Sequence, residues 1–254
     1  MNLFNLEGRV AIVTGGNGGI GLGMAEGMAE AGATLVLAGR NAEKGAAAVT
    51  KLEALGATAS FTALDVTDEA ACHALIDDTA SRHGRLDILI NNAGTNIRKE
   101  PEEYTLDEWR FVLDTNLTSA FSCSQAAYPA IKKSGGGKII NIGSMFSLFG
   151  ASFSTAYAAS KGGMVQMTKA MASAWAKDNI QVNAVLPGWI DTELTRGARQ
   201  DVEGLHERIE ARTPAGRWGR PDEFQGIAVF LAGTGSDFVT GAVIPIDGGF
   251  SAQG

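Results

Sequence analysis

A tyrosine and a lysine four residues apart are the clearest candidates for proton chemistry in this chain of 254 residues. Tyr157 and Lys161 lie in a segment with a helical pattern, and an i, i+4 spacing places both side chains on one face of a helix. An ammonium group beside a phenol lowers the pKa of the phenol. A tyrosine tuned in this way can act as a general acid and base near neutral pH. An amphipathic helix face is the alternative explanation of the spacing.

Two polar stretches follow apolar runs that read as strands. Ser144 comes just after the run 138–142, and Asn91-Asn92-Ala93-Gly94 ends the run 86–91. The hydroxyl group of Ser144 could orient a substrate oxygen, or it could cap the next turn. The paired amides can cap several backbone groups, and Ala93 and Gly94 leave room for a cofactor. Because ligands of parallel α/β sheets bind at the carboxyl ends of the strands, we expect both stretches to border a site.

The glycine-rich run from Thr14 to Gly23 lies between a short apolar run and a helical pattern. It fits two phosphate-binding patterns: G-x-G-x-x-G with Gly16, Gly18 and Gly21, and T-G-x-x-x-G-x-G with Thr14, Gly15, Gly19 and Gly21. Glycines let phosphate groups approach the backbone closely, and the N-terminus of the following helix attracts a pyrophosphate. The context predicts a dinucleotide site. A tight strand-to-helix turn without a ligand is the alternative.

The end of the second apolar run, Leu37-Ala38-Gly39-Arg40-Asn41, decides which dinucleotide is expected. NAD sites of this kind usually place an acidic residue there, on the 2′-hydroxyl of the adenosine ribose. This chain has Arg40 instead, and a guanidinium group can bind a 2′-phosphate through two hydrogen bonds. We therefore expect NADP, with NAD as the alternative cofactor. A solvated Arg40 at the start of a helix is the explanation without a ligand.

Asp65 ends the third apolar run and is a further candidate for the cofactor site. Its carboxylate could accept a hydrogen bond from the amino group of adenine. The alternative is a helix cap, although Thr67 or Asp68 fits that role better.

Short apolar runs alternate with longer helical patterns along the whole chain. The expected strands are 10–14, 34–38, 59–64, 86–91, 138–142, 180–185 and 242–246, and the expected helices include 42–55, 68–83, 106–133, 156–177 and 221–232. Most of the runs are continuously apolar, as in parallel strands buried on both faces. The pattern predicts a single α/β domain over residues 1–254, with a doubly wound parallel sheet (Rossmann fold) of about seven strands in three layers.

The segment 191–217 breaks this rhythm, because it holds many charged residues and leads into Thr213-Pro214-Ala215-Gly216-Arg217-Trp218-Gly219. A polar insertion after the sixth strand, at the carboxyl edge of the sheet, predicts a substrate lid at about residues 190–217. A surface helix that faces a partner is the alternative.

Composition limits the partners and the compartment. With 28 acidic and 21 basic residues, the net charge is −7, which disfavours nucleic acid as a partner. No apolar run has the length of a membrane span, and residues 1–9 lack the pattern of a secretory signal, so we expect a cytoplasmic protein without a membrane partner. Cys72 and Cys123 are expected to be buried thiols. The three histidines make no metal-ligand spacing, so no metal site is expected.

Taken in order, these motifs resemble the short-chain dehydrogenase/reductase family over essentially the whole chain. The matching residues are Thr14, Gly15, Gly19, Gly21, Asp65, Asn91, Asn92, Ala93, Gly94, Asn116, Ser144, Tyr157, Lys161, Pro187, Gly188, Asp247, Gly248 and Gly249. The resemblance favours the glycine register 15, 19 and 21. It implies an enzyme that transfers hydride between a nicotinamide cofactor and a ketone or secondary alcohol, with a small molecule as substrate.

The resemblance also implies a role for each catalytic residue. Tyr157 would be the acid and base, Ser144 would hold the substrate oxygen, and Asn116 would hold a water that links Lys161 to solvent. Lys161 would bind the nicotinamide ribose and lower the pKa of Tyr157. Family members are commonly tetramers, with helices around Asn116 and Tyr157 between subunits, so we expect a homotetramer. Cofactor contacts are expected from Gly15, Asn17, Gly19, Ile20, Gly21, Arg40, Asp65, Val66, Asn92, Ala93, Gly94, Tyr157, Lys161, Pro187, Gly188, Ile190 and Thr192.

One position bears on the choice of cofactor. Many NADP-using relatives carry a basic residue just before the second motif glycine, where this chain has Gly18. The 2′-phosphate would therefore depend on Arg40, alone or with Asn41.

Within the family, residues 96–99, 211–219 and 229–232 are similar to the sugar-acid branch, above all to gluconate 5-dehydrogenases and deoxygluconate dehydrogenases. Arg98 should lie near the nicotinamide end of the cleft, where it could bind a carboxylate through two hydrogen bonds. A surface salt bridge to Glu100, Glu102 or Glu103 is the alternative. Trp189 could cover the nicotinamide or the substrate, or it could pack in the core. The expected substrate contacts are Arg98, Ser144, Met145, Tyr157 and Trp189.

Two other functions remain open. Met145, Phe146, Leu148 and Phe149 predict an apolar pocket entrance, which favours a hydrophobic ketone over a polyol. This would suit a 3-oxoacyl-carrier-protein reductase or a broad-range carbonyl reductase, although no basic patch for an acidic carrier protein is evident. A dinucleotide-sensing regulator on the same fold is the third hypothesis. Such a regulator would not need the four predicted catalytic residues, and their presence disfavours it.

Overall fold

Seven parallel strands form one sheet within residues 3–253, the part of the chain that the computed structural model describes, apart from the side chains of residues 200 and 201. The strands are β1 (Val10–Thr14), β2 (Thr34–Gly39), β3 (Ala59–Ala63), β4 (Ile88–Asn91), β5 (Gly137–Ile142), β6 (Ile180–Pro187) and β7 (Val243–Ile246). Their order is β3-β2-β1-β4-β5-β6-β7. Because the direction of winding reverses between β1 and β4, the predicted doubly wound α/β fold is confirmed.

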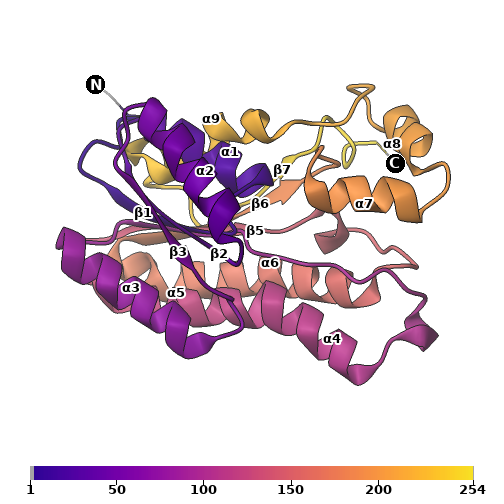
Figure 1. Cartoon of the computed structure of the whole chain (residues 1–254), viewed down its shortest axis with the longest axis horizontal. Coiled ribbons are helices and arrows are strands. Elements are labelled where there is room, and N and C mark those ends of the chain that lie inside the picture. Colours follow the sequence, from indigo (N-terminus) through magenta and orange to yellow (C-terminus); the bar gives the residue numbers. More distant parts are fainter. Residues whose placement is uncertain (1–2, 254) are drawn as a thin grey trace.

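Helices cover both faces of the sheet (Figure 1). One face carries α1 (Gly19–Glu30), α2 (Ala42–Ala54) and α9 (Gln225–Ala232), and the other carries α3 (Glu69–His83), α5 (Ser119–Lys133) and α6 (Thr155–Trp175). The helix α4 (Leu106–Leu113) packs against α6. Short 3₁₀ turns occupy Pro101–Glu103, Met145–Ser147, Ala176–Asp178, Pro221–Phe224 and Thr234–Ser236.

The segment predicted as a lid folds into two helices after β6. They are α7 (Glu193–Asp201) and α8 (Leu205–Arg212), which lie together in orange in Figure 1. The ends of the predicted domain, residues 1, 2 and 254, lie outside the described residues. Within residues 3–253, no helix is long and apolar enough to span a membrane, and no group of three His, Cys, Asp or Glu side chains is placed to hold a metal ion.

One predicted helix is interrupted by a wider turn. The sequence predicts a single helix over residues 106–133, whereas the structure has α4, a π-helical turn at Asp114–Thr118, and then α5. A π-turn carries one extra residue and often lies at functional sites. Here it contains Asn116, which is fully buried. The helical stretch predicted over residues 106–133 is confirmed in its bounds, but apolar spacing over so long a run does not resolve the one inserted residue.

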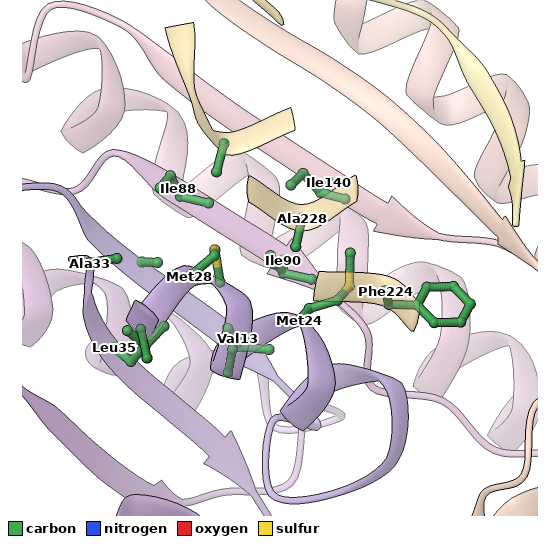
Figure 2. Packing of buried hydrophobic residues seen from close by; sticks show 14 of the residues in the cluster. Val13, Met24, Met28, Ala33, Leu35, Ile88, Ile90, Ile140, Phe224 and Ala228 are labelled. Carbon is green, nitrogen blue, oxygen red and sulfur yellow. The ribbon is translucent and has the colours of Figure 1, made fainter. Parts of the chain in front are cut away.

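Separate apolar clusters bury the two faces of the sheet. Successive residues of a strand point to opposite faces, so Val13 of β1 belongs to the cluster under α1 and α9, whereas Ile12 belongs to the cluster under α3 and α5. Figure 2 shows the first cluster, in which Met24 and Met28 of α1 lie among strand residues and Phe224. Burial of each such side chain stabilises the fold by about 1.5–3 kcal/mol.

The second cluster contains both cysteines. Cys72 of α3 and Cys123 of α5 are buried and free, as predicted.

The edge strands depart from the expectation of strands buried on both faces. In β3, Thr62 and Ala63 are exposed and the other three residues are half-buried, and β7 is also only partly covered. Each of these strands has a neighbour on one side only. The central strands β1, β4, β5 and β6 are buried throughout, so the expectation holds for the centre of the sheet.

The contact between α1 and the turn before α9 is so close that only glycine fits at position 23. A Cβ atom on Gly23 would lie 2.1 Å from the carbonyl oxygen of Pro221. We expect Gly23→Ala to lower the free energy of unfolding by about 1–3 kcal/mol or more, because overpacking forces the backbone apart. Urea denaturation measures this change.

Gly226→Ala is the matched control, because Gly226 lies in α9 with open space around its Cα atom. Alanine is favoured over glycine in a helix by roughly 0.5–1 kcal/mol, so this variant should be as stable as the parent or more stable. Equal losses in the two variants would contradict the close approach at position 23.

Candidate active site

The carboxyl ends of β1 to β6 border one cavity of about 560 Å³. Parallel strands end at the same edge of a sheet, which is why residues far apart in the sequence meet here. Two predicted site residues, Gly21 and Asn116, lie outside the lining. The predicted residues that line the cavity are Gly15, Asn17, Gly19, Ile20, Arg40, Asp65, Val66, Asn92, Ala93, Gly94, Arg98, Ser144, Met145, Tyr157, Lys161, Pro187, Gly188, Trp189, Ile190 and Thr192.

The loop after β1 requires glycine at three positions. Gly15 and Gly19 have φ values of +63° and +52°, a conformation that residues with side chains rarely adopt. A Cβ atom on Gly21 would lie 2.4 Å from Asn92 Nδ2, so Gly21 allows α1 to pack against the end of β4. No side chain caps the start of α1. Its first backbone N–H groups are therefore suited to bind an anion.

Asn92 and Thr14 fasten the glycine loop to the end of β4. Asn92 Nδ2 donates to the carbonyl oxygens of Thr14 and Gly15, at 3.1 and 2.9 Å. In return, Thr14 Oγ1 accepts from the backbone N–H groups of Asn92 and Ala93, at 3.1 and 3.2 Å. The predicted role of the paired amides as backbone caps is thereby found for Asn92. These hydrogen bonds fix the position of the glycine loop relative to the end of β4.

Asn116 is buried beside the cavity and bonds to the segments that carry Thr95 and Ser160. Its Oδ1 accepts from the backbone N–H of Thr95 at 2.7 Å, and its Nδ2 donates to the carbonyl oxygen of Thr95 at 2.9 Å and to Ser160 Oγ at 3.0 Å. Lys161 Nζ donates to the carbonyl oxygen of Ile142 at 2.7 Å. A Cβ atom on Gly94 would lie 3.3 Å from Asn116 Oδ1 and 3.6 Å from Lys161 Nζ, so both side chains converge on this glycine.

Tyr157 differs from its predicted electrostatic state. Burial raises the pKa of Tyr157, and a hydrogen bond from Ser144 and the charge of Arg98 only partly offset this effect. The pKa of Tyr157 is therefore raised and not lowered as predicted, because burial outweighs the favourable contacts. The predicted neighbourhood itself is present, since Lys161 Nζ lies over the Tyr157 ring, 5.7 Å from its centroid. The same ammonium group donates to Ile142, and burial lowers the pKa of Lys161 to about 8.

Ser144 caps the next turn, which is one of the two roles that the sequence left open, and its contact with a substrate oxygen stays a prediction. Its hydroxyl group is hydrogen-bonded to Tyr157, and it also accepts from the backbone N–H of Phe146 at 3.2 Å. The cap fixes the hydroxyl group at the start of the 3₁₀ turn Met145–Ser147, beside the phenol.

The other end of the cavity is formed by residues after β2 and β3. Asp65 Oδ1 accepts from the backbone N–H of Thr67, which is the largest influence that lowers the pKa of Asp65; Arg40 contributes further. Asp68 caps α3, as the sequence favoured. Asn41 caps α2. Arg40 and Asp65 thus face the same end of the cavity, one cationic and one anionic.

Arg98 and an aromatic wall define the end near Tyr157. Arg98 Nη2 donates to the carbonyl oxygen of Leu194 at 3.0 Å, which links the loop after β4 to α7. Trp189 packs edge-on against Phe146 and Trp218, with ring centroids 6.0 and 5.5 Å apart. Trp189 is therefore both a lining residue and part of an aromatic cluster.

Only part of the predicted apolar entrance faces the cavity. Met145 and Phe146 line it, whereas Leu148 and Phe149 do not. Leu148 is exposed, and Phe149 packs against Phe250. These two residues follow the 3₁₀ turn, whose tight winding directs them away from the cavity.

Several lining residues were not predicted. They include Gly18 and Lys44 at the cofactor end, and Thr95, Asn96 and Phe153 near Tyr157. Lys44 had a usable signal, since it lies four residues after Arg40 at the start of a predicted helix. No sequence signal indicated Phe153, because it lies in a loop without helical or strand periodicity.

Comparison with known proteins places this geometry among oxidoreductases. A family model described as enoyl-(acyl carrier protein) reductase matches residues 15–251. The chain is 41% identical to a 2-dehydro-3-deoxy-D-gluconate 5-dehydrogenase of Dickeya dadantii over 100% of this chain and 99% of that protein. It is also 41% identical to a gluconate 5-dehydrogenase of Gluconobacter oxydans, over 99% and 98% of the two chains. The crystal structure of a gluconate 5-dehydrogenase from Burkholderia cenocepacia, in complex with NADP and tartrate, is similar with a TM-score of 0.94 and 40% identity, over 100% and 99%.

The buried lysine should make stability depend on pH. The pKa of Lys161 is about 8 in the folded protein and 10.5 as its reference value. Between these pH values the unfolded chain binds more protons, so the free energy of unfolding rises with pH. From pH 8 to pH 10 we expect a gain of about 2 kcal/mol from this residue. The gain is measured by urea denaturation as the difference between the parent and Lys161→Met.

Lys169→Met is the control, because Lys169 is exposed on the same helix. It should show the same pH dependence as the parent. If Lys161→Met also follows the parent, Lys161 does not have a lowered pKa.

Proposed function

The chain belongs to the short-chain dehydrogenase/reductase family, and we propose that it is an NADP-dependent oxidoreductase that interconverts a secondary alcohol and a ketone on a sugar acid. The observation that carries this proposal is the meeting of Ser144, Tyr157 and Lys161 at one end of a cavity, where Arg98 also lies. Proton-transfer groups and a cation for a carboxylate are thus placed in one site.

The cavity suits a dinucleotide. The positive φ angles of Gly15 and Gly19 shape the turn that lines the cavity, and the uncapped start of α1 offers N–H groups to a pyrophosphate. Arg40 stands at the end of β2, where an NAD site usually has an acid, so we propose NADP, with NAD as the weaker alternative. The NADP bound in the Burkholderia cenocepacia relative supports this choice. When bound, the cofactor would supply the hydride as NADPH in ketone reduction and accept it as NADP⁺ in alcohol oxidation.

The residues around Tyr157 divide the proton chemistry among them. In ketone reduction, Tyr157 gives its phenolic proton to the carbonyl oxygen, and in alcohol oxidation it takes the proton back. Ser144 holds that oxygen through its hydroxyl group. Because burial keeps Tyr157 protonated, the cavity favours the acid form before substrate binds. We propose that Lys161 contacts the nicotinamide ribose and that Asn116 fixes the backbone beside it and holds a water linked to Lys161.

Arg98 supports an acidic substrate. A guanidinium group binds a carboxylate through two charge-assisted hydrogen bonds, and Arg98 faces the cavity close enough to Tyr157 to affect its pKa. The tartrate in the Burkholderia cenocepacia relative is itself a dicarboxylate. We propose that α7 and α8 act as a lid over this end, since Leu194 and Thr195 of α7 line the cavity.

A second candidate function rests on the aromatic wall. Phe146, Phe153 and Trp189 line the cavity next to Tyr157, and such rings favour a hydrophobic ketone over a chain of hydroxyl groups. A broad-range carbonyl reductase or 3-oxoacyl-carrier-protein reductase would use this wall. The intact set of Ser144, Tyr157 and Lys161 argues against a regulator that only senses the dinucleotide.

The assembly and the compartment are also proposals. Leu106 and Phe111 of α4 and Phe121 of α5 are exposed apolar side chains on neighbouring helices, which supports a homotetramer formed through this surface. The two free cysteines support a reducing compartment, and we propose the cytoplasm.

A substrate panel distinguishes the two functions. Gluconate, 5-ketogluconate, an acetoacetyl thioester and neutral ketones are assayed with NADPH or NADP, and with NADH or NAD. For a sugar acid, Arg98→Met should raise KM about 10- to 100-fold, because a charge-assisted contact is lost, and change KM for neutral ketones by less than about twofold. Tyr157→Phe should lower kcat for every substrate by about 10²–10⁴-fold.

A higher kcat/KM for neutral ketones, together with no effect of Arg98→Met, would favour the second candidate. Turnover of all substrates by Tyr157→Phe at the parent rate would contradict the catalytic assignment itself.

A charged residue on the exposed face of α5 tests the proposed tetramer. Phe121→Glu should lower the mass in sedimentation velocity from about four copies of the 26.4 kDa chain to two, because burying an unpaired charge at an interface is costly. Leu55→Glu, at the exposed end of α2, is the control and should keep the parent mass. A parent protein that sediments as a single chain would contradict the tetramer.

A further inference from the structure

An ion pair joins α2 and α7, two helices whose first turns line the cavity away from the predicted catalytic residues. Lys44 Nζ lies 2.5 Å from Glu193 Oε2, although the two residues are 149 positions apart in the chain. Lys44 is in the first turn of α2 and Glu193 is the first residue of α7, and both line the cavity. A Cβ atom on Gly19 would lie 3.3 Å from Thr192 Cγ2, so the start of α7 also reaches the glycine loop.

Lys44 belongs to the same turn as the predicted 2′-phosphate position. Its backbone N–H donates to Asn41 Oδ1 at 2.9 Å, directly after Arg40. Among the described residues that line the cavity, the cations are Arg40, Lys44, Arg98 and Lys161. The last two lie near Tyr157, so Arg40 and Lys44 are the pair at the adenosine end. Gly18 adds no charge there.

The ion pair is exposed enough for another anion to take the place of Glu193 on Lys44. The side chains are 49% and 84% exposed, and exposed ion pairs contribute little to stability. A phosphate monoester carries a charge of about −1.5 to −2 near neutral pH and has three acceptor oxygens. Glu193 offers one negative charge. As the first residue of α7, Glu193 remains stabilised by the helix dipole when Lys44 leaves.

We propose that Lys44 is a second residue that selects NADP over NAD, and that Glu193 competes with the 2′-phosphate for its ammonium group. When NADP binds, Lys44 leaves Glu193 and donates hydrogen bonds to the phosphate. When NAD binds, the uncharged 2′-hydroxyl cannot displace the carboxylate, and the pair stays in place. This inference rests on the proposed use of NADP.

Binding of the cofactor alone, without substrate, tests the inference. The Kd values for NADPH and NADH are measured by quenching of tryptophan fluorescence for the parent, Lys44→Met, Glu193→Gln and the double variant. Lys44→Met should weaken NADPH about tenfold and change NADH by less than about twofold. Glu193→Gln should strengthen NADPH severalfold, and this gain should vanish in the double variant, because the two residues act on the same contact.

Lys51→Met is the matched control. Lys51 lies on the same helix and pairs with Glu26 at 2.5 Å, but it does not line the cavity. It should leave both Kd values unchanged.

A merely structural pair would behave differently. If the pair only holds the lid closed, Lys44→Met and Glu193→Gln should shift NADPH binding in the same direction and affect NADH equally, and this result would overturn the inference. An unchanged ratio of NADPH to NADH affinity in Lys44→Met would also overturn it while leaving the proposed function intact. A parent protein that binds NADH more tightly than NADPH would overturn both.

Discussion

The hydrogen bonds between Thr14 and Asn92 set the geometry on which the site depends. They join the ends of β1 and β4, the two strands between which the order of the sheet reverses. The close approach explains the glycines around it, because a Cβ atom on Gly15 would lie 2.8 Å from Asn92 Nδ2 and one on Gly21 2.4 Å. With side chains at these positions, α1 could not start where its N–H groups face the cavity. The glycine run is therefore part of a fixed turn and not a flexible linker.

Most of the fold could be predicted because it depends on local pattern. The mostly apolar runs mark β1, β5 and β6, which are buried on both faces. The polar residues within them have partners inside the protein: Asn141 donates to Thr168, and Asn183 donates to the carbonyl oxygen of Val239. The π-turn at Asp114–Thr118 could not be predicted, because it depends on Asn116 bonding to Thr95, a residue 21 positions earlier. The partial exposure of β3 could not be predicted either, because it follows from the position of β3 at the edge of the sheet and not from its own sequence.

The residues of the site could be predicted better than their physical state. Their order and spacing placed nearly all of them around one cavity, since the carboxyl ends of parallel strands must meet. Their electrostatics depend on burial and on partners far away in sequence. Lys161 illustrates the difference: its spacing from Tyr157 implied an ammonium group beside a phenol, and its Nζ does lie over the Tyr157 ring, but its pKa is lowered by burial against Ile142 on β5. Helical spacing gives the shared face but not the burial that sets the pKa of each side chain.

The charged residues that line the cavity are mostly cationic, whereas the protein as a whole is acidic. The chain carries a net charge of −7, whereas the cavity is lined by Arg40, Lys44, Arg98 and Lys161 against Asp65 and Glu193. At physiological ionic strength, interactions between exposed charges are screened beyond about 8 Å. The acidic surface therefore repels an anionic ligand only weakly, and recognition depends on cations within contact distance. Because Arg40 and Lys44 lie at one end of the cavity and Arg98 and Lys161 lie at the end near Tyr157, a phosphate group at the first end and a carboxylate at the second each meet a cation.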